Sequence, residues 1–386
     1  MISGERFSAV YRITGSENEA LEKAKDICFE ETVEFPEELV PNGMIRENVV
    51  GRIESFEPYQ GSQTNQLGLE SYRAVISFAI ETTANEFTQL LTVLFGNLSL
   101  KPGFCLEEII LPPSILRLFQ GPRFGRAGLR NWLGVPKRPL LFTALKPMGL
   151  SARELANIAY KLALGGIDII KDDHGLTNQC FAPFEERVTL CAKAVEKANQ
   201  ETGYYCIYVA NITAPSDEVF FRAKLAKEAG ARGLMVAPAI IGLDTMRQLA
   251  KNDQIGLPIF SHPAFQGSYV IGQASGISHY ALFGQIARLA GADATIYPNF
   301  GGRFSFNREE CEQIVRGTVV KMGHIQPIFP GPGGGMSLER VPDLLQIYGL
   351  DVIFLIGGGL FKHGPNLIEN CRYFRQIVEN YMDTLL

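Results

Sequence analysis

What this sequence of 386 residues lacks restricts what it can be. Its seven cysteines are scattered and include no C-x-x-C pair, which argues against a disulfide framework or a zinc site and favours reduced thiols in the cytoplasm. No uninterrupted apolar run approaches the roughly 20 residues that cross a bilayer. Glu5 and Arg6 interrupt any apolar region near the N-terminus, so neither a membrane span nor a signal peptide is expected.

An excess of one charge is missing as well. The net charge is −5, and residues of both signs are interspersed. There is no basic stripe to bind nucleic acid and no acidic tail to indicate disorder. With 46% apolar and 20% charged residues, the composition is typical of a globular protein. We expect a cytoplasmic protein with no nucleic-acid or membrane partner.

What is present, from about residue 137 onward, is a repeated pattern of a short apolar run, a loop and an amphipathic stretch. The runs are PLLFTAL (139–145), IDIIK (167–171), YYCIYVA (204–210), GLMVAP (233–238), LPIFSHP (257–263), ATIYPNF (294–300), IQPIFP (325–330) and VIFLIGG (352–358). Apolar strands that alternate with helices indicate a parallel sheet, and eight of them predict a (β/α)8 barrel. A doubly wound sheet is the alternative, but no G-x-G-x-x-G motif follows the first run.

The first 120 residues have a different pattern. RFSAVYRIT, VVGRIESFEP and YRAVISFAIE read as strands, while NEALEKAKDICFEE and NEFTQLLTVLFGN read as helices. LPPSILRLFQGPRFG resembles a linker. We therefore predict an α/β protein in which a small ferredoxin-like α+β domain (1–120) precedes a barrel domain (121–386) that carries the active site.

The ends of the predicted barrel strands carry the reactive groups, as expected for this architecture. IDIIK closes in Lys171, Asp172, Asp173 and His174. Because strand residues alternate, Lys171 and Asp173 should share one face and Asp172 the other. Asp173 and His174 form a plausible pair of ligands for a divalent metal.

Lys171 permits several interpretations. A lysine ammonium has no lone pair with which to bind a metal, but a lysine near other cations or in a dry pocket loses its proton readily. It could then form a Schiff base with a carbonyl substrate, or take up carbon dioxide and become a carbamate, in effect a carboxylate. A salt bridge at the barrel rim is the purely structural alternative.

Two glycine-rich segments follow the last two strands. Gly334 and Gly335 lie in PGPGGG, and Gly358 and Gly359 lie in FLIGGG. Such loops bind phosphate through backbone N–H groups, and barrels often place that site after strands seven and eight. Tight turns are the alternative. After strand five, His262 could act as a general acid or base or contact the substrate, or it could make only a structural hydrogen bond.

These motifs resemble those of the ribulose-bisphosphate carboxylase (RuBisCO) large chain. GGIDIIKDDH is similar to its G-G-x-D-x-x-K-D-D-E signature, and TALKPMGLS to its strand-one motif. PGPGGG and FLIGGG take the places of its phosphate loops, and FGNLSLKPG is similar to its segment around a substrate-facing asparagine. The order and spacing hold over nearly the whole chain.

The resemblance implies roles for single residues. Lys171 would be the carbamylated lysine (N6-carboxylysine), Asp173 a ligand of one Mg²⁺ per subunit, and His174 would stand where the family usually has a glutamate ligand. Lys146 would move protons at an enediolate. The glycines at 334, 335, 358 and 359 would bind a phosphate.

The same resemblance implies a homodimer whose active site lies at the subunit interface. Glu30 and Asn97 would reach into the active site of the partner subunit.

Departures from the family pattern exclude carbon dioxide fixation. The strand-one motif lacks its second lysine, because Pro147 is followed by Met148 and Gly149. His262 is followed by Pro263 where the carboxylase has an arginine for the second phosphate. YPNFGGRF replaces a segment that leads to the mobile-loop lysine. The chain therefore resembles a RuBisCO-like protein of form IV that acts on a sugar-acid monophosphate.

For the reaction, we first predict a 3-oxo-isoapionate-4-phosphate decarboxylase of apiose breakdown, a magnesium-dependent lyase. Histidine in place of glutamate makes the metal site more positive, and Arg303 could bind the substrate carboxylate bidentately. A transcarboxylase or hydrolase acting on the same substrate comes next. The third candidate is a 5-methylthioribulose-1-phosphate isomerase or a 2,3-diketo-5-methylthiopentyl-1-phosphate enolase, whose apolar substrates call for a more apolar pocket than YPNFGGRF suggests.

Two interpretations belong to other classes. A Schiff-base aldolase would use Lys146 or Lys171. The other is a binding protein without catalytic activity. In that case there would be no turnover, and a Lys146 substitution would have no effect on it.

Overall fold

The computed structural model describes residues 2–59 and 70–384. The chain divides into two compact units. Unit 1 comprises Met1–Phe119, Gln266–Gln285 and Lys321–His324. Unit 2 comprises Gln120–Phe265, Ile286–Val320 and Ile325–Leu386. Both units are thus assembled from segments that lie apart in the sequence.

Unit 1 is built on a five-stranded sheet. Its strands are β1 (Arg6–Thr14), β2 (Arg52–Pro58), β3 (Ser71–Ala79), β4 (Phe104–Ile110) and β10 (Gly276–Ile277), in the order β10-β4-β1-β3-β2. Its helical segments are α1 (Glu17–Glu30), η1 (Glu37–Leu39), η2 (Ile45–Val49), η3 (Ile80–Thr83), α2 (Phe87–Phe95), η4 (Asn97–Leu100), α3 (Pro113–Leu116) and α10 (Gly267–Val270), with η5 (Tyr280–Ile286) at its boundary. Antiparallel β1 to β4 with α1 and α2 form the predicted ferredoxin-like arrangement.

The local sequence explains this unit. Helix α1 buries Ala20, Ala24, Ile27 and Cys28, which form one stripe at helical spacing. Strands β4 and β10 are not predicted from the sequence. Strand β10 has only two residues and pairs with a strand that lies about 170 positions earlier in the chain, so no local pattern marks it.

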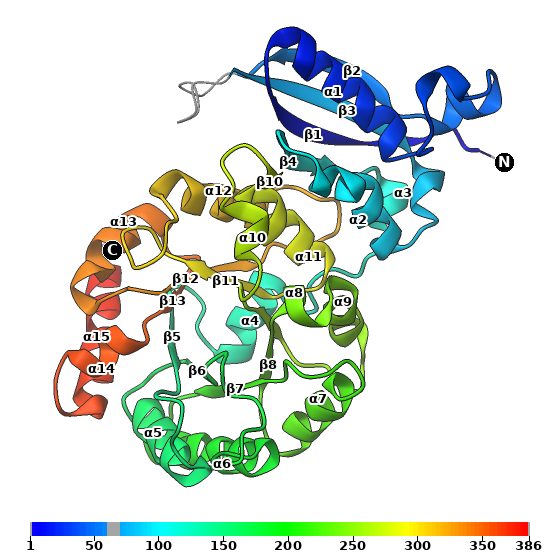
Figure 1. The fold of residues 1–386 in the computed structure, drawn as a ribbon. Coiled ribbons are helices and arrows are strands. Elements are labelled where there is room, and N and C mark those ends of the chain that lie inside the picture. The colour runs from blue at the N-terminus through cyan, green and yellow to red at the C-terminus, as the bar shows by residue number, and fades with distance from the viewer. Residues whose placement is uncertain (1, 60–69, 385–386) are drawn as a thin grey trace. The chain divides into compact units, whose positions relative to one another are not determined.

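Unit 2 is the predicted (β/α)8 barrel (Figure 1). Its strands are β5 (Leu140–Ala144), β6 (Ile169–Lys171), β7 (Ile207–Asn211), β8 (Gly233–Val236), β9 (Ile259–Ser261), β11 (Ala294–Pro298), β12 (Phe329–Gly333) and β13 (Ile353–Leu355). All of them pair in parallel, in the order β12-β11-β9-β8-β7-β6-β5-β13. The chain thus runs around the barrel in sequence, whereas a doubly wound sheet would reverse its strand order.

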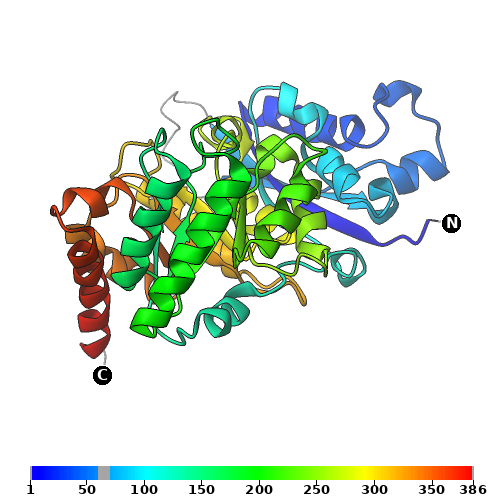
Figure 2. The ribbon, with the colours of Figure 1, turned by 90° about the horizontal axis from the view of Figure 1, so that it is seen from below.

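Helices surround this barrel, and α5 and α6 lie side by side on its outside (Figures 1 and 2). The helical segments are α4 (Gly125–Leu133), α5 (Ala152–Leu164), α6 (Phe184–Thr202), α7 (Val219–Glu228), α8 (Pro238–Ile241), α9 (Leu243–Lys251), α11 (Ala287–Leu289), α12 (Arg308–Val319), η6 (Leu338–Arg340), α13 (Val341–Tyr348), α14 (Gly358–Lys362) and α15 (Leu367–Asp383). Ser151 begins α5 with a capping box that includes Glu154. Within the described residues, no helix has the length and apolar character needed to cross a membrane.

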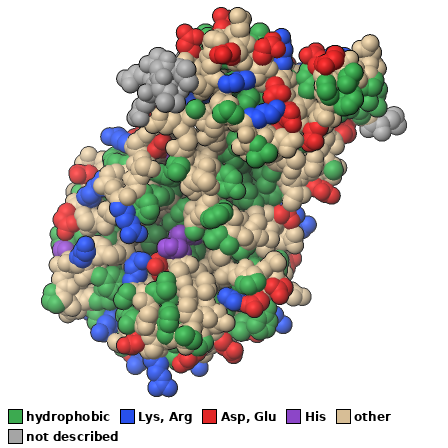
Figure 3. Space-filling model, viewed as in Figure 1, with side chains coloured by type: hydrophobic (Ala, Val, Ile, Leu, Met, Phe, Trp, Pro, Cys, Tyr) green, Lys and Arg blue, Asp and Glu red, His purple; other side chains and the backbone are tan. Residues whose placement is uncertain are grey.

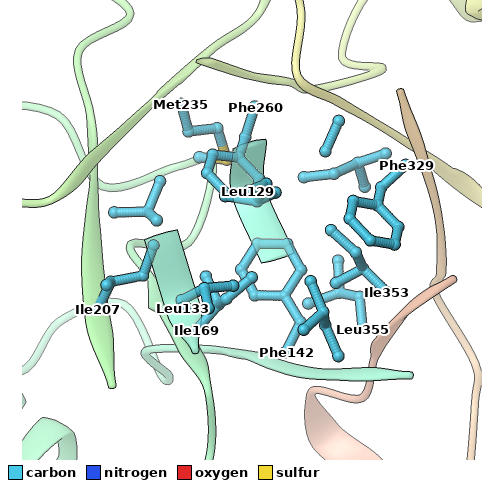
Figure 4. Close-up of a cluster of buried hydrophobic side chains, with 14 of the residues drawn as sticks. Leu129, Leu133, Phe142, Ile169, Ile207, Met235, Phe260, Phe329, Ile353 and Leu355 are labelled. Carbon is cyan, nitrogen blue, oxygen red and sulfur yellow. The ribbon is translucent and has the colours of Figure 1, made fainter. Parts of the chain in front are cut away.

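The interior of the barrel is a packed apolar core. Phe142, Ile169 and Phe260 point inward from their strands, and Leu129 and Leu133 of α4 complete the cluster (Figure 4). Helix α4 is not predicted from the sequence. Because the core fills the barrel, the reactive residues are left to the strand ends.

Strand β12 corrects one predicted boundary. The sequence pattern places this strand at 325–330 and treats PGPGGG as a loop, but the strand covers Phe329–Gly333. Pro330 and Pro332 cannot donate backbone hydrogen bonds. They are tolerated because β12 is an edge strand: among the described residues it pairs with β11 on one side, and no pairing with β13 is found on the other.

Candidate active site

Strand β6 ends in charged residues that point in opposite directions. Lys171 is 1% exposed and follows the same strand face as Ile169. Asp172 faces the other way, where it accepts a hydrogen bond from Tyr208 Oη at 2.7 Å and lies 3.3 Å from Arg187 Nε of α6. Asp172 therefore holds the end of the strand in place. Lys171, on the opposite face, is the candidate for a chemical role.

The Lys171 amine lies in an environment that disfavours its charge. Burial, together with the nearby charge of Lys146, lowers the pKa of Lys171 to about 8, although Asp173 and Asp172 act in the opposite direction. Its Nζ donates to the backbone oxygen of Asp172 at 3.1 Å. A substantial fraction of the amine is therefore neutral near pH 8, as an attack on carbon dioxide or on a carbonyl group requires.

Asp173 joins two further residues predicted from the sequence. Lys146, just after β5, donates from Nζ to Asp173 Oδ2 at 2.8 Å, and Nδ1 of His174 lies 3.4 Å from Asp173 Oδ1. Burial alone would raise the pKa of Asp173. Hydrogen bonds from His174 and Lys146 and the charges of both lysines outweigh it, so the pKa of Asp173 lies well below its ordinary value. The carboxylate is therefore ionised at neutral pH.

His262, directly after β9, completes this cluster. Its ring stacks on His174 with 4.7 Å between centroids, and its Nδ1 accepts a hydrogen bond from the Ala264 N–H at 3.1 Å. Burial and the nearby cationic groups lower the pKa of His262 well below its ordinary value, so the ring is neutral. Because Nδ1 accepts, the proton lies on Nε2 and can be donated to a substrate. Figure 3 shows histidine atoms beside basic and acidic atoms in a hollow of the viewed face.

Three glycine loops approach one another through their backbones. A Cβ on Gly302 would lie 2.4 Å from the Gly334 oxygen, and one on Gly335 would lie 2.8 Å from Gly302 Cα. A Cβ on Gly359 would lie 2.4 Å from the oxygen of Met336. Only glycine fits at these positions. The predicted phosphate loops after β12 and β13 are therefore neighbours.

These loops also lie beside the lysine cluster. A Cβ on Gly357 would lie 3.5 Å from Cε of Lys146, so the Lys146 side chain passes along this loop. A Cβ on Gly358 would meet nothing within 4 Å, which leaves open space there. The structure thus brings Lys146 between the carboxylate of Asp173 and the proposed phosphate site.

Arg303 lies beside the same loops. It is exposed, and its guanidinium lies 4.9 Å from the centroid of the Phe304 ring. That ring covers Gly334, since a Cβ there would lie 2.8 Å from it. Among the described residues, no carboxylate forms an ion pair with Arg303.

Glu30 and Asn97 belong to unit 1 and form a network of their own. Asn97 Nδ2 donates to Glu30 Oε1 at 3.0 Å, and Lys101 Nζ donates to Glu30 Oε2 at 2.8 Å. The buried carboxylate of Glu31 accepts hydrogen bonds from the N–H groups of Gly96 and Leu98. Glu31 thus fixes the turn that presents Asn97, a role that is not predicted from the sequence.

Two further contacts near the site are not predicted from the sequence. Tyr348 Oη donates to Asn299 Oδ1 at 2.6 Å, and the N–H of Asn299 donates to the Gly333 oxygen at 2.7 Å. Met148 is 49% exposed and covers the turn after His174, because a Cβ on Gly175 would lie 2.6 Å from its Cε. No local signal in the sequence could have revealed these contacts between distant segments.

The residues at the end of β6 fit a divalent ion under one condition. Within the described residues, no group of three His, Cys, Asp or Glu side chains could hold a metal ion. Asp173 and His174 supply two ligands. A carbamate on Lys171 would supply the third, and its amine has the burial and the lowered pKa that such a reaction favours.

Comparisons with known proteins identify the family of this chain. The family model for the ribulose bisphosphate carboxylase large chain, catalytic domain, matches residues 125–383. The 5-methylthioribulose-1-phosphate isomerase of Rhodospirillum rubrum is 35% identical over 371 residues, which cover 96% of this chain and 95% of that protein. A 2,3-diketo-5-methylthiopentyl-1-phosphate enolase of Geobacillus thermodenitrificans is 35% identical over 312 residues, which cover 80% of this chain and 75% of that protein.

A solved structure extends the match to nearly the whole chain. The crystal structure of a RuBisCO-like protein from Rhodopseudomonas palustris has a TM-score of 0.86 and 36% sequence identity, and the match covers 97% of this chain and 98% of that chain. The resemblance predicted from the strand-end motifs is thereby confirmed. The chain belongs to the ribulose-bisphosphate carboxylase large-chain family and is similar to its RuBisCO-like proteins.

Proposed function

We propose that this protein is an enzyme that moves a proton at a carbon next to a carbonyl group in a sugar monophosphate. One observation carries this proposal: Lys146 contacts Asp173 at 2.8 Å and also passes along the glycine loop at Gly357. A proton-transfer group, a carboxylate and an anion site are thus contiguous. Related members of the family are an isomerase and an enolase by name.

The residues divide the chemistry among them. Family membership implies Mg²⁺ and a carbamylated lysine, and Lys171, Asp173 and His174 would hold the ion. A bound divalent ion would polarise the substrate oxygens and stabilise the developing enolate. Lys146 moves the proton at carbon, and Asp173 orients its Nζ. His262 donates from Nε2 to a substrate oxygen.

The phosphate is bound by backbone N–H groups of the loops at Gly334, Gly335, Gly358 and Gly359. Glycine allows a phosphate to approach the backbone closely. The open space at Gly358 supports this assignment.

For the substrate, the isomerase or enolase alternative now comes first. Exposed apolar side chains border both halves of the site: Met148 covers the turn after His174, and Phe304 covers Gly334. An apolar substrate tail, such as the methylthio group of 5-methylthioribulose 1-phosphate, would bind well against such surfaces. The local sequence alone does not reveal this apolar border.

The 3-oxo-isoapionate-4-phosphate decarboxylase remains a second candidate, together with the hydrolase on the same substrate. The observation in its favour is Arg303, which is exposed and forms no ion pair among the described residues. It could therefore bind the carboxylate of a β-keto acid.

We propose no carboxylase activity. Pro263 follows His262, so an arginine for a second phosphate is missing at that position. In the loop after β11, Gly301, Gly302 and Arg303 stand where the family has the segment that leads to its mobile-loop lysine. A bisphosphate would leave one end poorly neutralised.

We further propose a homodimer in which Glu30 and Asn97 complete the active site of the partner subunit. Their support is local: the two side chains are hydrogen-bonded to each other, and Lys101 and Glu31 hold them in place. Such a network would hold the two polar side chains in a fixed position for the active site of the partner subunit.

The function is tested by giving the purified protein each candidate substrate with a divalent ion and bicarbonate, and identifying the products by NMR. We expect an isomer of unchanged mass from 5-methylthioribulose 1-phosphate. Release of carbon dioxide from 3-oxo-isoapionate 4-phosphate would instead establish the decarboxylase. Lys146→Met should abolish turnover, while the exposed Lys224→Met serves as the matched control. Equal activity of the two variants would contradict the role of Lys146.

A further inference from the structure

The proposed metal site contains an imidazole among its ligands. Sites built only from oxygen suit Mg²⁺, which binds carboxylates and retains its waters. Imidazole suits first-row transition ions such as Co²⁺ and Zn²⁺. We infer that His174 is a direct ligand that shifts the preference of this site from Mg²⁺ towards such an ion. The inference rests on the proposed metal-supported function.

The positions of the donor atoms are compatible with one shared ion. Nδ1 of His174 lies 3.4 Å from Oδ1 of Asp173. Two ligand atoms that each lie about 2.1 Å from one ion are at most about 4.2 Å apart. His174 has 52% of its side chain exposed, so its ring also has room to turn towards an ion. Asp173 and His174 can therefore bind together without rearrangement of the strand.

His174 is built into the site and is not an incidental surface histidine. The buried Asn211 donates from Nδ2 to the backbone oxygen of His174 at 2.9 Å and to that of Leu176 at 2.9 Å. On the other side, His262 stacks on the ring at 4.7 Å, nearly parallel at 14°. These contacts fix the backbone at His174 and keep its ring against that of His262.

The charge count points to the same preference. A carbamate on Lys171 and the carboxylate of Asp173 together carry two negative charges, which balance one divalent ion. An imidazole ligand adds no negative charge and contributes a nitrogen donor instead. A glutamate at this position would add a negative charge and an oxygen, which are the features that Mg²⁺ favours. Replacing His174 by glutamate should therefore change the selectivity of the site.

The test measures metal binding in the absence of substrate. Wild type and His174→Glu are titrated calorimetrically with Mg²⁺ and with Co²⁺ in buffer equilibrated with bicarbonate. We expect the ratio of Kd for Mg²⁺ to Kd for Co²⁺ to fall about tenfold or more in the variant. An unchanged ratio overturns the inference. Because His174 is half-exposed, the variant should fold, and circular dichroism checks this.

Pulsed EPR of the Mn²⁺-loaded protein tests the bond itself. Wild type should show coupling to a directly bound imidazole nitrogen, His174→Glu should lack it, and the control His262→Gln should retain it. Bound Mn²⁺ without nitrogen coupling in wild type overturns the inference. If the coupling is present but no substrate turns over, the inference stands and only the proposed function fails. If wild type binds no ion, both fail.

Discussion

The buried Lys171 destabilises the folded protein when its side chain is charged, and its proposed function would explain why it is present. A lysine that is 1% exposed and titrates near pH 8 instead of 10.5 is destabilising as an ammonium. The folded protein releases this proton at lower pH than the unfolded chain does. The cost is therefore fully present below pH 8 and disappears as the pH rises towards 10.5.

We predict that Lys171→Met stabilises the protein and abolishes its activity. In buffer free of carbon dioxide at pH 7, the gain should be about 3 kcal/mol in the free energy of unfolding. Urea denaturation at pH 7 and pH 10 measures it, and the advantage of the variant should shrink at the higher pH. A variant less stable than wild type at pH 7 would contradict the burial argument.

At this scale, much of the site could be predicted from the sequence. The alternation of a strand separates Asp172 from Lys171 and Asp173, and the contacts of Asp172 with Tyr208 and Arg187 bear this out. The exposed Met148 could not be assigned, because its contact with the turn at Gly175 depends on the meeting of two loops.

At the scale of elements, two glycines at the start of the loop after β13 have different environments. Gly359 packs against the oxygen of Met336, with only 2.4 Å available to a Cβ, whereas Gly358 faces open space. We predict that Gly359→Ala lowers the melting temperature. Gly358→Ala should leave the melting temperature unchanged but raise the KM for the phosphorylated substrate, because a methyl group would occupy the proposed phosphate position. Thermal melts and steady-state kinetics measure both effects. Unchanged KM in Gly358→Ala would argue against a phosphate at this loop.

Tyr348 of α13 acts on the same loops from outside the site. Its hydroxyl orients Asn299, whose N–H binds the oxygen of Gly333. We predict that Tyr348→Phe raises KM severalfold and changes kcat little, because it loosens the proposed phosphate site and leaves Lys146 in place. Tyr160→Phe is the control, because this partly exposed tyrosine of α5 also donates a hydrogen bond, to Glu201. A fall in kcat at constant KM would place Tyr348 in the chemical step instead.

The elements also show where patterns in the sequence are insufficient. Most barrel strands are predicted because they are apolar on both faces. Strand β12 is displaced because its Pro330 and Pro332 read as a loop, although they are tolerated beside the unpaired edge. Helix α4 is missed because only the assembled barrel reveals that Leu129 and Leu133 fill its core.

For the whole molecule, the proposed dimer can be tested by subunit complementation. Subunits with Lys146→Met and subunits with Glu30→Gln plus Asn97→Ala should each be inactive alone. If each site combines residues from two subunits, mixed dimers contain one intact site, and random mixing should restore about a quarter of wild-type activity. Refolding the mixture and assaying it measures this. No recovery, despite mixed dimers seen by native mass spectrometry, would contradict the shared site.

The central claim is that this chain moves a proton at carbon through Lys146, beside Asp173 and Lys171. The most direct measurement is mass spectrometry of 5-methylthioribulose 1-phosphate and its product after incubation in D2O with a divalent ion and bicarbonate. Wild type and Lys224→Met should introduce solvent deuterium at the carbon next to the carbonyl, and Lys146→Met should introduce none. Turnover without deuterium in wild type, or unchanged labelling in Lys146→Met, would contradict this account.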